Sequence, residues 1–510
     1  MFPITLPTSP ETLANLAALV ADEADYEAKI VQARNYHDGA QFVHLTARLR
    51  EFLGGDSSDT SKDADRLRLN VARIVVSAVV ERLIVNNFDS DETGEAVAQP
   101  DALGQAQPSI VKPVADWAWK VWRANKMDAK QHRVHEATVR DSESFVIVDW
   151  DTEAMRARFT PHLRYIDQST TFGSSADVGE GCRAFYRNDD RDQELLYVTK
   201  RWTEVLYDGI TRIERQRLTM YFPDKIVKYS GYSGAWEPIK DATDTAWPIP
   251  WLHEDKTPMG IPAIHFTSQD MEAREAWPAQ NAINYLCALE LTAADMTAFR
   301  ILVALGWEPV DADGNDLVIS PGTWVGTKNK DGKVQDIPPA DIAPISNLVE
   351  GWVYRAAMVT DTPVSRFITT KQVSAEGTIK QTDAPLVAKI ENRQGELGNG
   401  WECCMNMARR LENTFGAGGL DEEVALYTGW KSAVTRDEDA EIARAQKLIA
   451  IGIPFTEVAT DTLGYDMAKV TQWDEERKAQ KQAEMDALAK QPQGVQPATN
   501  GKAPMMTGVK

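Results

Sequence analysis

The stretch that decides the fold runs from Leu69 to Phe88 and reads "LNVARIVVSAVVERLIVNNF". It is the apolar centre of a chain that is otherwise polar and acidic. Its polar residues are spaced by three and four positions and comprise Asn70, Arg73, Ser77 and Glu81. In an α-helix these positions form one narrow stripe, whereas in a strand they would fall on both faces. The spacing therefore predicts a helix that is apolar nearly all round, which other elements normally surround.

A membrane-spanning helix is the first alternative for this stretch. Such a helix needs about 20 predominantly apolar residues, and Arg73, Glu81 and Arg82 interrupt the apolar run too early. The N-terminus also lacks the basic and apolar regions of a signal peptide. We therefore expect an ordinary buried helix and no targeting to a membrane or to secretion.

Composition sets further limits. At 510 residues the chain is long enough for several domains, and its hydrophobic content of 43% favours a folded protein. With 55 Lys+Arg against 76 Asp+Glu, the formal net charge is -21, so the chain repels polyanions at long range. The 4 cysteines are too few and too scattered for a disulfide framework or a zinc site. They indicate a reducing compartment.

The periodicity changes along the chain and predicts an α+β, mainly helical fold. Helices are expected over 11–53 and in the tryptophan-rich stretch 114–141, and short strands between 143 and 266. A long helix is expected over 277–306, followed by a hairpin turn at Asp331-Gly332 and a second helix over 345–359.

The longest predicted helix follows. Asp383 and Pro385 are expected as its N-cap and first turn, and Gly398 and Gly400 are expected to kink it. The apolar stripe of this helix comprises Leu386, Ile390, Leu397, Trp401, Cys404, Ala408 and Leu411. Glycines from Gly416 end it; more helix is expected from 436, with a disordered tail at the C-terminus.

Motifs that would carry chemistry are weak. "HRVHE", from His132 to Glu136, matches neither order of the zinc-peptidase motif, so an exposed helix with two histidines is preferred. "GTKNKDGKV" is one residue too long for a phosphate-binding loop and has Val334 where Ser or Thr is needed. No carboxylate pair stands out as an acid/base couple. We expect no enzyme activity, no cofactor and no metal.

The order of the parts resembles that of the phage portal protein family, of the type found in long-tailed phages. The resemblance runs from about Tyr26 to Arg477 and rests on collinear segments, not on one specific motif. These segments are "VVERLIVNNF", "VWRANKMD", "GIPAIHF", "TPVSRF", "VSAEGTIKQTDAPLVAKIENRQGELGNGWE" and "DEDAEIARAQKLIAIGIPFTEVATDTLGYD".

The resemblance implies a portal-type fold with wing, stem, clip and crown regions. The expected boundaries are 1–276 for the N-terminal helices and β-rich wing, 277–306 for the first stem helix, 307–343 for the clip, 344–364 for the second stem helix, 365–381 for the tunnel loop, 382–475 for the crown helices and 476–510 for a charged helix and disordered tail. Residues 69–88 would then be a wing helix packed by its own subunit.

The resemblance also implies a function. The protein would form a ring, typically a dodecamer, at one capsid vertex, as the channel for DNA packaging and ejection. Its partners would be the terminase motor, the head-to-tail adaptor, the major capsid and scaffold proteins, and double-stranded DNA that passes without sequence specificity. It would reside in the virion and, during assembly, in the host cytoplasm. An acidic ring would hold the DNA by few phosphate contacts, each of which would slow its passage.

Candidate site residues follow from this assignment. Arg366, Lys371, Gln372 and Lys380 are the candidates for the tunnel loop, and Lys328, Lys330 and Lys333 for contacts of the clip. An ordinary surface role is the alternative for each of them, because isolated basic side chains usually serve solubility. Two other functions stay open: another capsid or scaffold assembly protein, and a cytoplasmic enzyme with an unrecognised pocket of converging polar groups.

Overall fold

The computed structural model describes most of the chain between residues 24 and 459. The described ranges are 24–43, 45–53, 67–92, 95–100, 106–111, 113–166, 179–232, 235–239, 248–298, 302–305, 333–336, 341–368, 376–434 and 438–459, with a few isolated positions besides. The chain divides into two compact units, Met1–Glu95 with Val111–Val434, and Ala96–Ile110 with Thr435–Lys510.

The apolar stretch forms helix α5, Val71–Val80, and its predicted burial is confirmed. Seven of its residues are buried, namely Val71, Ala72, Val75, Val76, Ala78, Val79 and Val80. The polar stripe faces outward, with Arg73 and Glu81 exposed. Asn70 caps the first turn by accepting from the amide of Arg73, and the side chain of Gln280 accepts from the amide of Ala72 at 3.3 Å. No helix among the described residues is long and apolar enough to cross a bilayer.

The expected helix does not reach Phe88, and that prediction was wrong. After Glu81 the chain turns, and Val85–Ser90 form strand β1, which pairs antiparallel with β15, Leu426–Trp430. Two consecutive asparagines, Asn86 and Asn87, favour a helix poorly. The partner strand lies far along the chain, so its hydrogen bonds were not visible in the local pattern.

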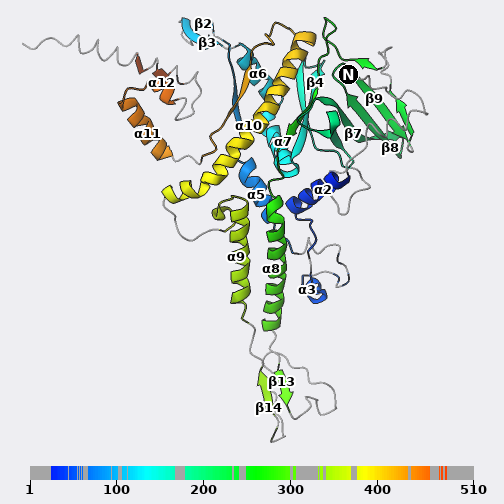
Figure 1. The fold of residues 1–510 in the computed structure, drawn as a ribbon, viewed down its shortest axis with the longest axis vertical. Helices are drawn as coiled ribbons and strands as arrows, with labels where there is room; N and C mark the ends of the chain where they lie inside the picture. Colours follow the sequence, from blue (N-terminus) through cyan, green and yellow to red (C-terminus); the bar gives the residue numbers. More distant parts are fainter. Residues whose placement is uncertain are drawn as a thin grey trace, which may run out of the picture. The chain divides into compact units, whose positions relative to one another are not determined.

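Other helices pack around α5. They are α2 (Ala24–Asp38), α7 (Met127–Asp141) and α10 (Glu376–Phe415). Helix α6 (Pro113–Ala124) packs against α7 and β1, and the short α3 (Ala47–Phe52) lies earlier in the chain. Figure 1 shows α10 running past α6 and α7. The tryptophan-rich stretch forms two helices because Lys126 adopts a left-handed conformation between them. The side chain of Asn125 holds this break by donating to Ala157 and accepting from the amide of Phe159.

The apolar stripe predicted for α10 is confirmed. All seven of its residues are buried: Leu386, Ile390, Leu397, Trp401, Cys404, Ala408 and Leu411. Gly400 permits close packing there, because a Cβ at this position would lie 2.4 Å from the ring of Phe266. The predicted start was wrong: α10 begins at Glu376, and Pro385 lies inside it. Asp383 is not an N-cap but the partner of Arg82.

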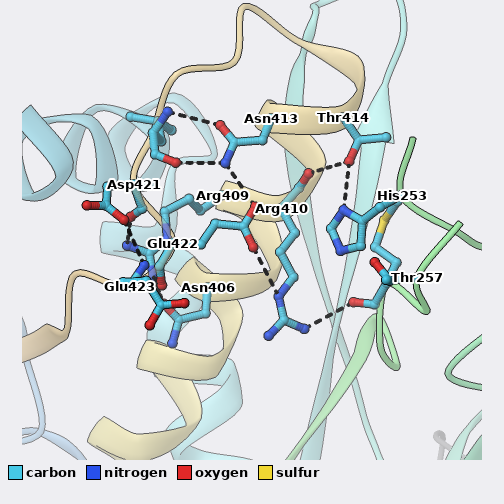
Figure 2. Close-up of polar contacts among 12 residues, drawn as sticks. His253, Thr257, Asn406, Arg409, Arg410, Asn413, Thr414, Asp421, Glu422 and Glu423 are labelled. Atoms are coloured by element: carbon cyan, nitrogen blue, oxygen red, sulfur yellow. Dashed lines mark hydrogen bonds and ion pairs between the residues drawn. The ribbon is translucent and has the colours of Figure 1, made fainter. Parts of the chain in front are cut away.

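The end of α10 follows the prediction from its glycines. Gly418 and Gly419 adopt positive φ angles just beyond the helix. Figure 2 shows the loop that follows, which Arg409 holds by donating to the backbone carbonyls of Asp421 and Glu422 at 2.7 and 3.0 Å. The side chain of Asn413 donates to the carbonyl of Leu420. These bonds satisfy carbonyl groups of the loop, which have no partner in a helix or strand.

The β-rich region predicted between 143 and 266 is confirmed as two antiparallel sheets. One has the order β12-β4-β5, formed by Ala263–Thr267, Glu143–Asp151 and Arg156–His162. The other has the order β10-β9-β8-β7-β6, with β11 also paired to β9. Its strands are β6 (Gly181–Tyr186), β7 (Leu195–Asp208), β8 (Thr211–Tyr221), β9 (Lys225–Tyr232), β10 (Ala235–Pro238) and β11 (Ile249–Pro250). Short 3-10 turns η3 (Arg187–Asp189), η4 (Arg274–Ala276) and η5 (Val364–Arg366) lie elsewhere in this unit. The predicted α+β class is therefore confirmed.

Two helices run side by side in Figure 1, α8 (Trp277–Ala298) and α9 (Ala343–Val359). Ile283 and Cys287 of α8 pack in one cluster with Ala356 of α9. The prediction of helix as far as Gly306 was wrong, because Leu302–Leu305 form strand β13, which pairs with β14, Lys333–Asp336. The run before Asp331, in which we expected the other hairpin strand, lies outside the described residues.

The second unit is smaller. It holds strands β2 (Glu95–Pro100) and β3 (Ala106–Val111), which pair with each other, and helices α11 (Glu438–Ala450) and α12 (Phe455–Glu457). Gly452 and Pro454 separate these helices, as the sequence predicts. The expected disordered tail lies outside the described residues, as does most of the charged helix.

Candidate functional site

Arg366 is the tunnel-loop candidate that the structure describes most fully. It ends η5, just after Pro363, and its guanidinium lies 2.7 Å from a carboxylate oxygen of Glu81 at the end of α5. The two side chains are 34% and 52% exposed. The charge of Arg366 is thus matched by a carboxylate of its own chain, which makes it a weaker phosphate ligand than an unpaired arginine.

Arg82, the residue next to Glu81, makes a second ion pair, in which the end of α5 supplies the cation and not the anion. Arg82 donates to a carboxylate oxygen of Asp383 at 2.9 Å, and its guanidinium also reaches the carbonyl of Ala433. These side chains are 17% and 12% exposed, so this pair is better shielded from solvent. Glu81 and Arg82 therefore hold residues on either side of the segment 367–382. We name the two pairs, Glu81–Arg366 and Arg82–Asp383, the loop anchors.

A third contact joins the early part of α10 to the end of α9. The ammonium group of Lys389 donates to the backbone carbonyl of Thr360 and to Glu272 at 2.7 Å. Arg393, one turn further along α10, lies 3.3 Å from the other oxygen of Glu272. Because Glu272 is almost fully buried, its charge requires these cationic partners.

Of the other candidate residues, Lys333 is the one whose side chain the structure describes. Lys371 and Gln372 lie outside the described residues, as do Lys328 and Lys330. The backbone of Lys380 lies in α10, but its side chain is not described. Lys333 is exposed at the start of β14, opposite Leu305.

Sequence reasoning missed the loop anchors. Glu81 was assigned to the polar stripe of α5 and Asp383 to a helix cap, because each residue type fits that local role. No local pattern connects them with residues about 300 positions away, and only the tertiary structure reveals the pairing.

The "HRVHE" motif lies on α7, and the preference for an exposed helix was wrong for one histidine. His132 is exposed, but His135 is fully buried. Its Nδ1 donates to the carbonyl of Leu83 at 3.0 Å, and its Nε2 accepts from the indole of Trp401 at 2.9 Å. Burial lowers the pKa of His135 to about 3, so the ring is neutral. It is a packing element of the core.

A second polar cluster lies where β4, β6 and β12 meet. The hydroxyl of Tyr186 donates to Nδ1 of His265 at 2.8 Å, and Nε2 of that ring donates to Glu143 at 2.8 Å. Arg164 and Arg191 lie 3.0 and 3.4 Å from the same carboxylate. The hydroxyl–imidazole–carboxylate order resembles the order found in hydrolase triads.

The protonation states of this cluster do not suit acid/base catalysis. Although burial opposes it, the charge of Arg164 and the bond from His265 lower the pKa of Glu143 to about 2. Burial raises the pKa of Tyr186 to about 12 and lowers the pKa of His265. A general acid or base works best with a pKa near the operating pH. These groups keep fixed protonation states near neutrality, as expected of a structural or binding site.

Comparison with known proteins agrees with the sequence analysis. No family model matches the chain. A portal protein of Mycobacterium phage D29 is 28% identical over 446 residues, which cover 80% of this chain and 79% of the relative. A portal protein of Mycobacterium phage L5 is 26% identical over 435 residues, covering 80% and 78%.

Among solved structures, an HK97 family phage portal protein from Corynebacterium diphtheriae is 11% identical, with coverage of 75% of this chain and 93% of that one. Its TM-score of 0.27 is too low to support the fold assignment. The two sequence relatives nevertheless span most of the chain and carry the same name. They confirm the similarity to phage portal proteins that the sequence predicts.

Proposed function

We propose that the chain assembles into a ring at one vertex of a phage capsid, through which DNA is packaged and later ejected. The observation that carries this proposal is the similarity to two portal proteins over four fifths of the chain. The subunit number is proposed to be twelve. The partners are proposed to be the terminase motor, the head-to-tail adaptor and the capsid and scaffold proteins.

The surface of α8 and α9 supports assembly with further copies. Apolar side chains of substantial size are exposed on both helices, namely Tyr285, Leu289, Leu348, Tyr354, Met358 and Val359. Exposed apolar side chains that gather on one element typically mark a protein interface. We therefore assign α8 and α9 to the stem, with β13 and β14 in the clip that connects them.

The loop anchors support a role as a tunnel loop for the segment between Arg366 and Asp383, the proposed 365–381, whose last residues from Glu376 belong to α10. Each end of the segment is tied to the end of α5, which is itself deeply buried. Both pairs hold their charges within the chain, which fits a channel that retains few free cations for phosphate.

The net charge of -21 fits a channel as well. Non-specific affinity for DNA increases with each phosphate that a basic side chain neutralises. An acidic ring would therefore let the duplex slide, and the remaining basic candidates, Lys371 and Lys380, would make the few contacts. We propose Lys328, Lys330 and Lys333 for contacts of the clip with the motor or the adaptor.

Imaging of the purified full-length protein by negative stain, together with mass measurement of the assembly, tests the proposal. Rings with a central hole and a mass of about twelve subunits are the expected result. Rings of another size would correct the subunit number alone. A monomer or compact dimer at every concentration would contradict the ring and favour a different assembly role.

A further inference from the structure

The cluster around Glu143 borders a small cavity that the portal function does not explain. The cavity measures about 80 Å³. Its lining residues come from α2, β4, β6, β12 and the adjoining loops and comprise Tyr26, Glu143, Arg164, Arg183, Ala184, Phe185, Tyr186, Arg191 and His265. We call it the arginine pocket. Pockets for drug-sized ligands measure about 300–1,000 Å³, so only a group of a few atoms fits here.

The charges of the pocket do not balance. Arg164 and Arg191 each carry a full positive charge, because guanidinium groups do not deprotonate in proteins. Among the described residues of the lining, Glu143 is the only acidic one, and its lowered pKa keeps it ionised. Burial lowers the pKa of His265, which leaves that ring neutral. The lining therefore has an excess of positive charge in a chain that is strongly acidic.

Glu143 does not satisfy all the donors of Arg164. One of its oxygens receives His265 at 2.8 Å and Arg191 at 3.4 Å, and the other lies 3.0 Å from Nε of Arg164. Among the described residues, Nε and Nη1 of Arg164 make no well-aligned hydrogen bond, although that side chain is only 3% exposed. Nε at least lies beside the carboxylate of Glu143, whereas Nη1 is a buried charged donor without an acceptor among the described residues. Such a donor is costly, so Nη1 calls for a further acceptor.

The walls of the pocket hold the arginines in place. The guanidinium groups of Arg191 and Arg164 lie 5.3 and 6.0 Å from the ring centre of Tyr26, and Arg183 lies 4.6 Å from that of Phe185. Cation–π contacts of this kind orient a guanidinium without neutralising it. Arg191 is 42% exposed, so the pocket can be reached from solvent.

We propose that the arginine pocket binds an oxyanion, that is, a carboxylate or phosphate group. Guanidinium groups match the planar or tetrahedral oxygens of such groups by paired hydrogen bonds. Two sources share this chemistry: a free small anion, or an acidic side chain of a second copy of this chain. In the second case the anion would join neighbouring subunits.

Inorganic phosphate is the probe for the test. It is titrated into the full-length protein by calorimetry at constant ionic strength, with chloride as the competing anion, in Arg191→Gln, Arg191→Lys and Arg187→Gln variants. Arg187 is the matched control, because it is an exposed arginine near the pocket that pairs with Glu194 and does not line the cavity. Circular dichroism verifies that each variant is folded.

We expect saturable phosphate binding that Arg191→Gln weakens about tenfold or more, since a hydrogen bond to a charged group is worth roughly that factor. Arg191→Lys keeps the charge but loses the fork, so its affinity should be intermediate. Arg187→Gln should bind as the unchanged protein does. Equal loss in Arg187→Gln and Arg191→Gln would overturn the proposal, because it would indicate non-specific attraction.

A comparison of separated subunits with assembled particles distinguishes the two sources. If the anion is free, both forms bind phosphate. If it is a side chain of a neighbour, only separated subunits bind phosphate, and Arg191→Gln weakens assembly while Arg187→Gln does not. The absence of phosphate binding in both forms, with unchanged assembly of Arg191→Gln, would overturn the proposal. The phosphate titration can be carried out whether or not rings form. A negative titration would therefore overturn the arginine-pocket proposal without contradicting the proposed portal function.

Discussion

Helices α5 and α9 are both rich in apolar residues, but they bury them to different degrees. In α5, Val71–Val80, seven of the residues are buried. In α9, Ala343–Val359, the buried residues are Ala356 and Ala357, whereas Leu348, Tyr354 and Met358 are 51%, 52% and 72% exposed. A single chain therefore completes the surroundings of α5 but leaves one face of α9 uncovered. An uncovered apolar face is what the proposed ring would bury.

The largest effect is expected where the core around α5 is densest. Trp401 is fully buried, with its ring centre 4.9 Å from Trp122 and 4.7 Å from Phe266. Trp401→Ala should lower the free energy of unfolding of the subunit by about 3–5 kcal/mol, as large-to-small core changes do. Tyr354→Ala on α9 is the control and should cost no more than about 0.5 kcal/mol. Urea unfolding measures the free energy of unfolding of both variants. Similar losses of stability would contradict the conclusion that the core around α5 is buried whereas the apolar face of α9 is exposed.

A smaller effect is expected from acid. The ordinary pKa of a histidine is 6.5, and burial lowers that of His135 to about 3. Between these values the unfolded chain binds a proton that the folded chain does not. The contribution of His135 to the free energy of unfolding is therefore fully present above pH 6.5. It is lost as the pH falls toward 3, by at most about 1.4 kcal/mol per pH unit. His162, whose pKa burial also lowers to about 3, adds to the same slope.

Unfolding titrations between pH 6.5 and 5 test this, because the lowered pKa of Glu143 acts only below its ordinary value of 4.5. The slope should be shallower in His135→Gln. It should be unchanged in variants of α9, which contains no histidine. If the free energy of unfolding of His135→Gln had the same pH dependence as that of the unchanged protein, the buried His135 ring would not be a source of the acid sensitivity.

The loop anchors at the end of α5 should contribute less. The exposed pair Glu81–Arg366 should couple by about 0.2–1 kcal/mol in a double-mutant cycle, and more weakly at high salt. The better shielded pair Arg82–Asp383 should couple more strongly. The cycles use Glu81→Gln with Arg366→Gln, and Arg82→Gln with Asp383→Asn. A stronger coupling for Glu81–Arg366 than for Arg82–Asp383 would contradict the conclusion that Arg82–Asp383 is the better shielded pair.

The smallest effect on the subunit is expected on α9. Leu348→Glu should change the free energy of unfolding of the separated subunit by no more than about 0.5 kcal/mol, because the side chain is half exposed. The same change should prevent ring assembly, as seen by imaging and mass measurement. Asn347→Glu, at the exposed neighbouring position, adds an equal charge without removing an apolar group and should still assemble. Normal rings from Leu348→Glu would exclude this face from the interface.

The sequence predicted elements well wherever burial follows a regular period. The stripe of α10 and the alternating strands of the β-rich region were found because repeated apolar positions specify one buried face. Boundaries were less predictable. Residues 85–90 and 302–305 are strands, since distant partners supply hydrogen bonds that a local helix pattern cannot include. Pro385 suggested a helix start, but α10 accommodates it inside the first turns.

The candidate sites also divide into residues that a local sequence pattern identifies and partners that lie far away in the sequence. Arg366 was recognised as a basic residue of the loop, but its partner Glu81 was not, because the pair joins segments far apart in sequence. The arginine pocket was not predicted at all. Its residues come from separate strands, a helix and loops, and none of them stands in a recognisable motif.

By itself the sequence determined the burial of α5, the stripe of α10, the α+β class and the similarity to portal proteins. These depend on periodicity and on the order of segments, both of which are written along the chain. The folded structure was needed to find which charges meet, as in the loop anchors, and which histidine is buried. The physical reason is that ion pairs and pockets depend on distances between residues remote in sequence, and local patterns carry no information about such distances.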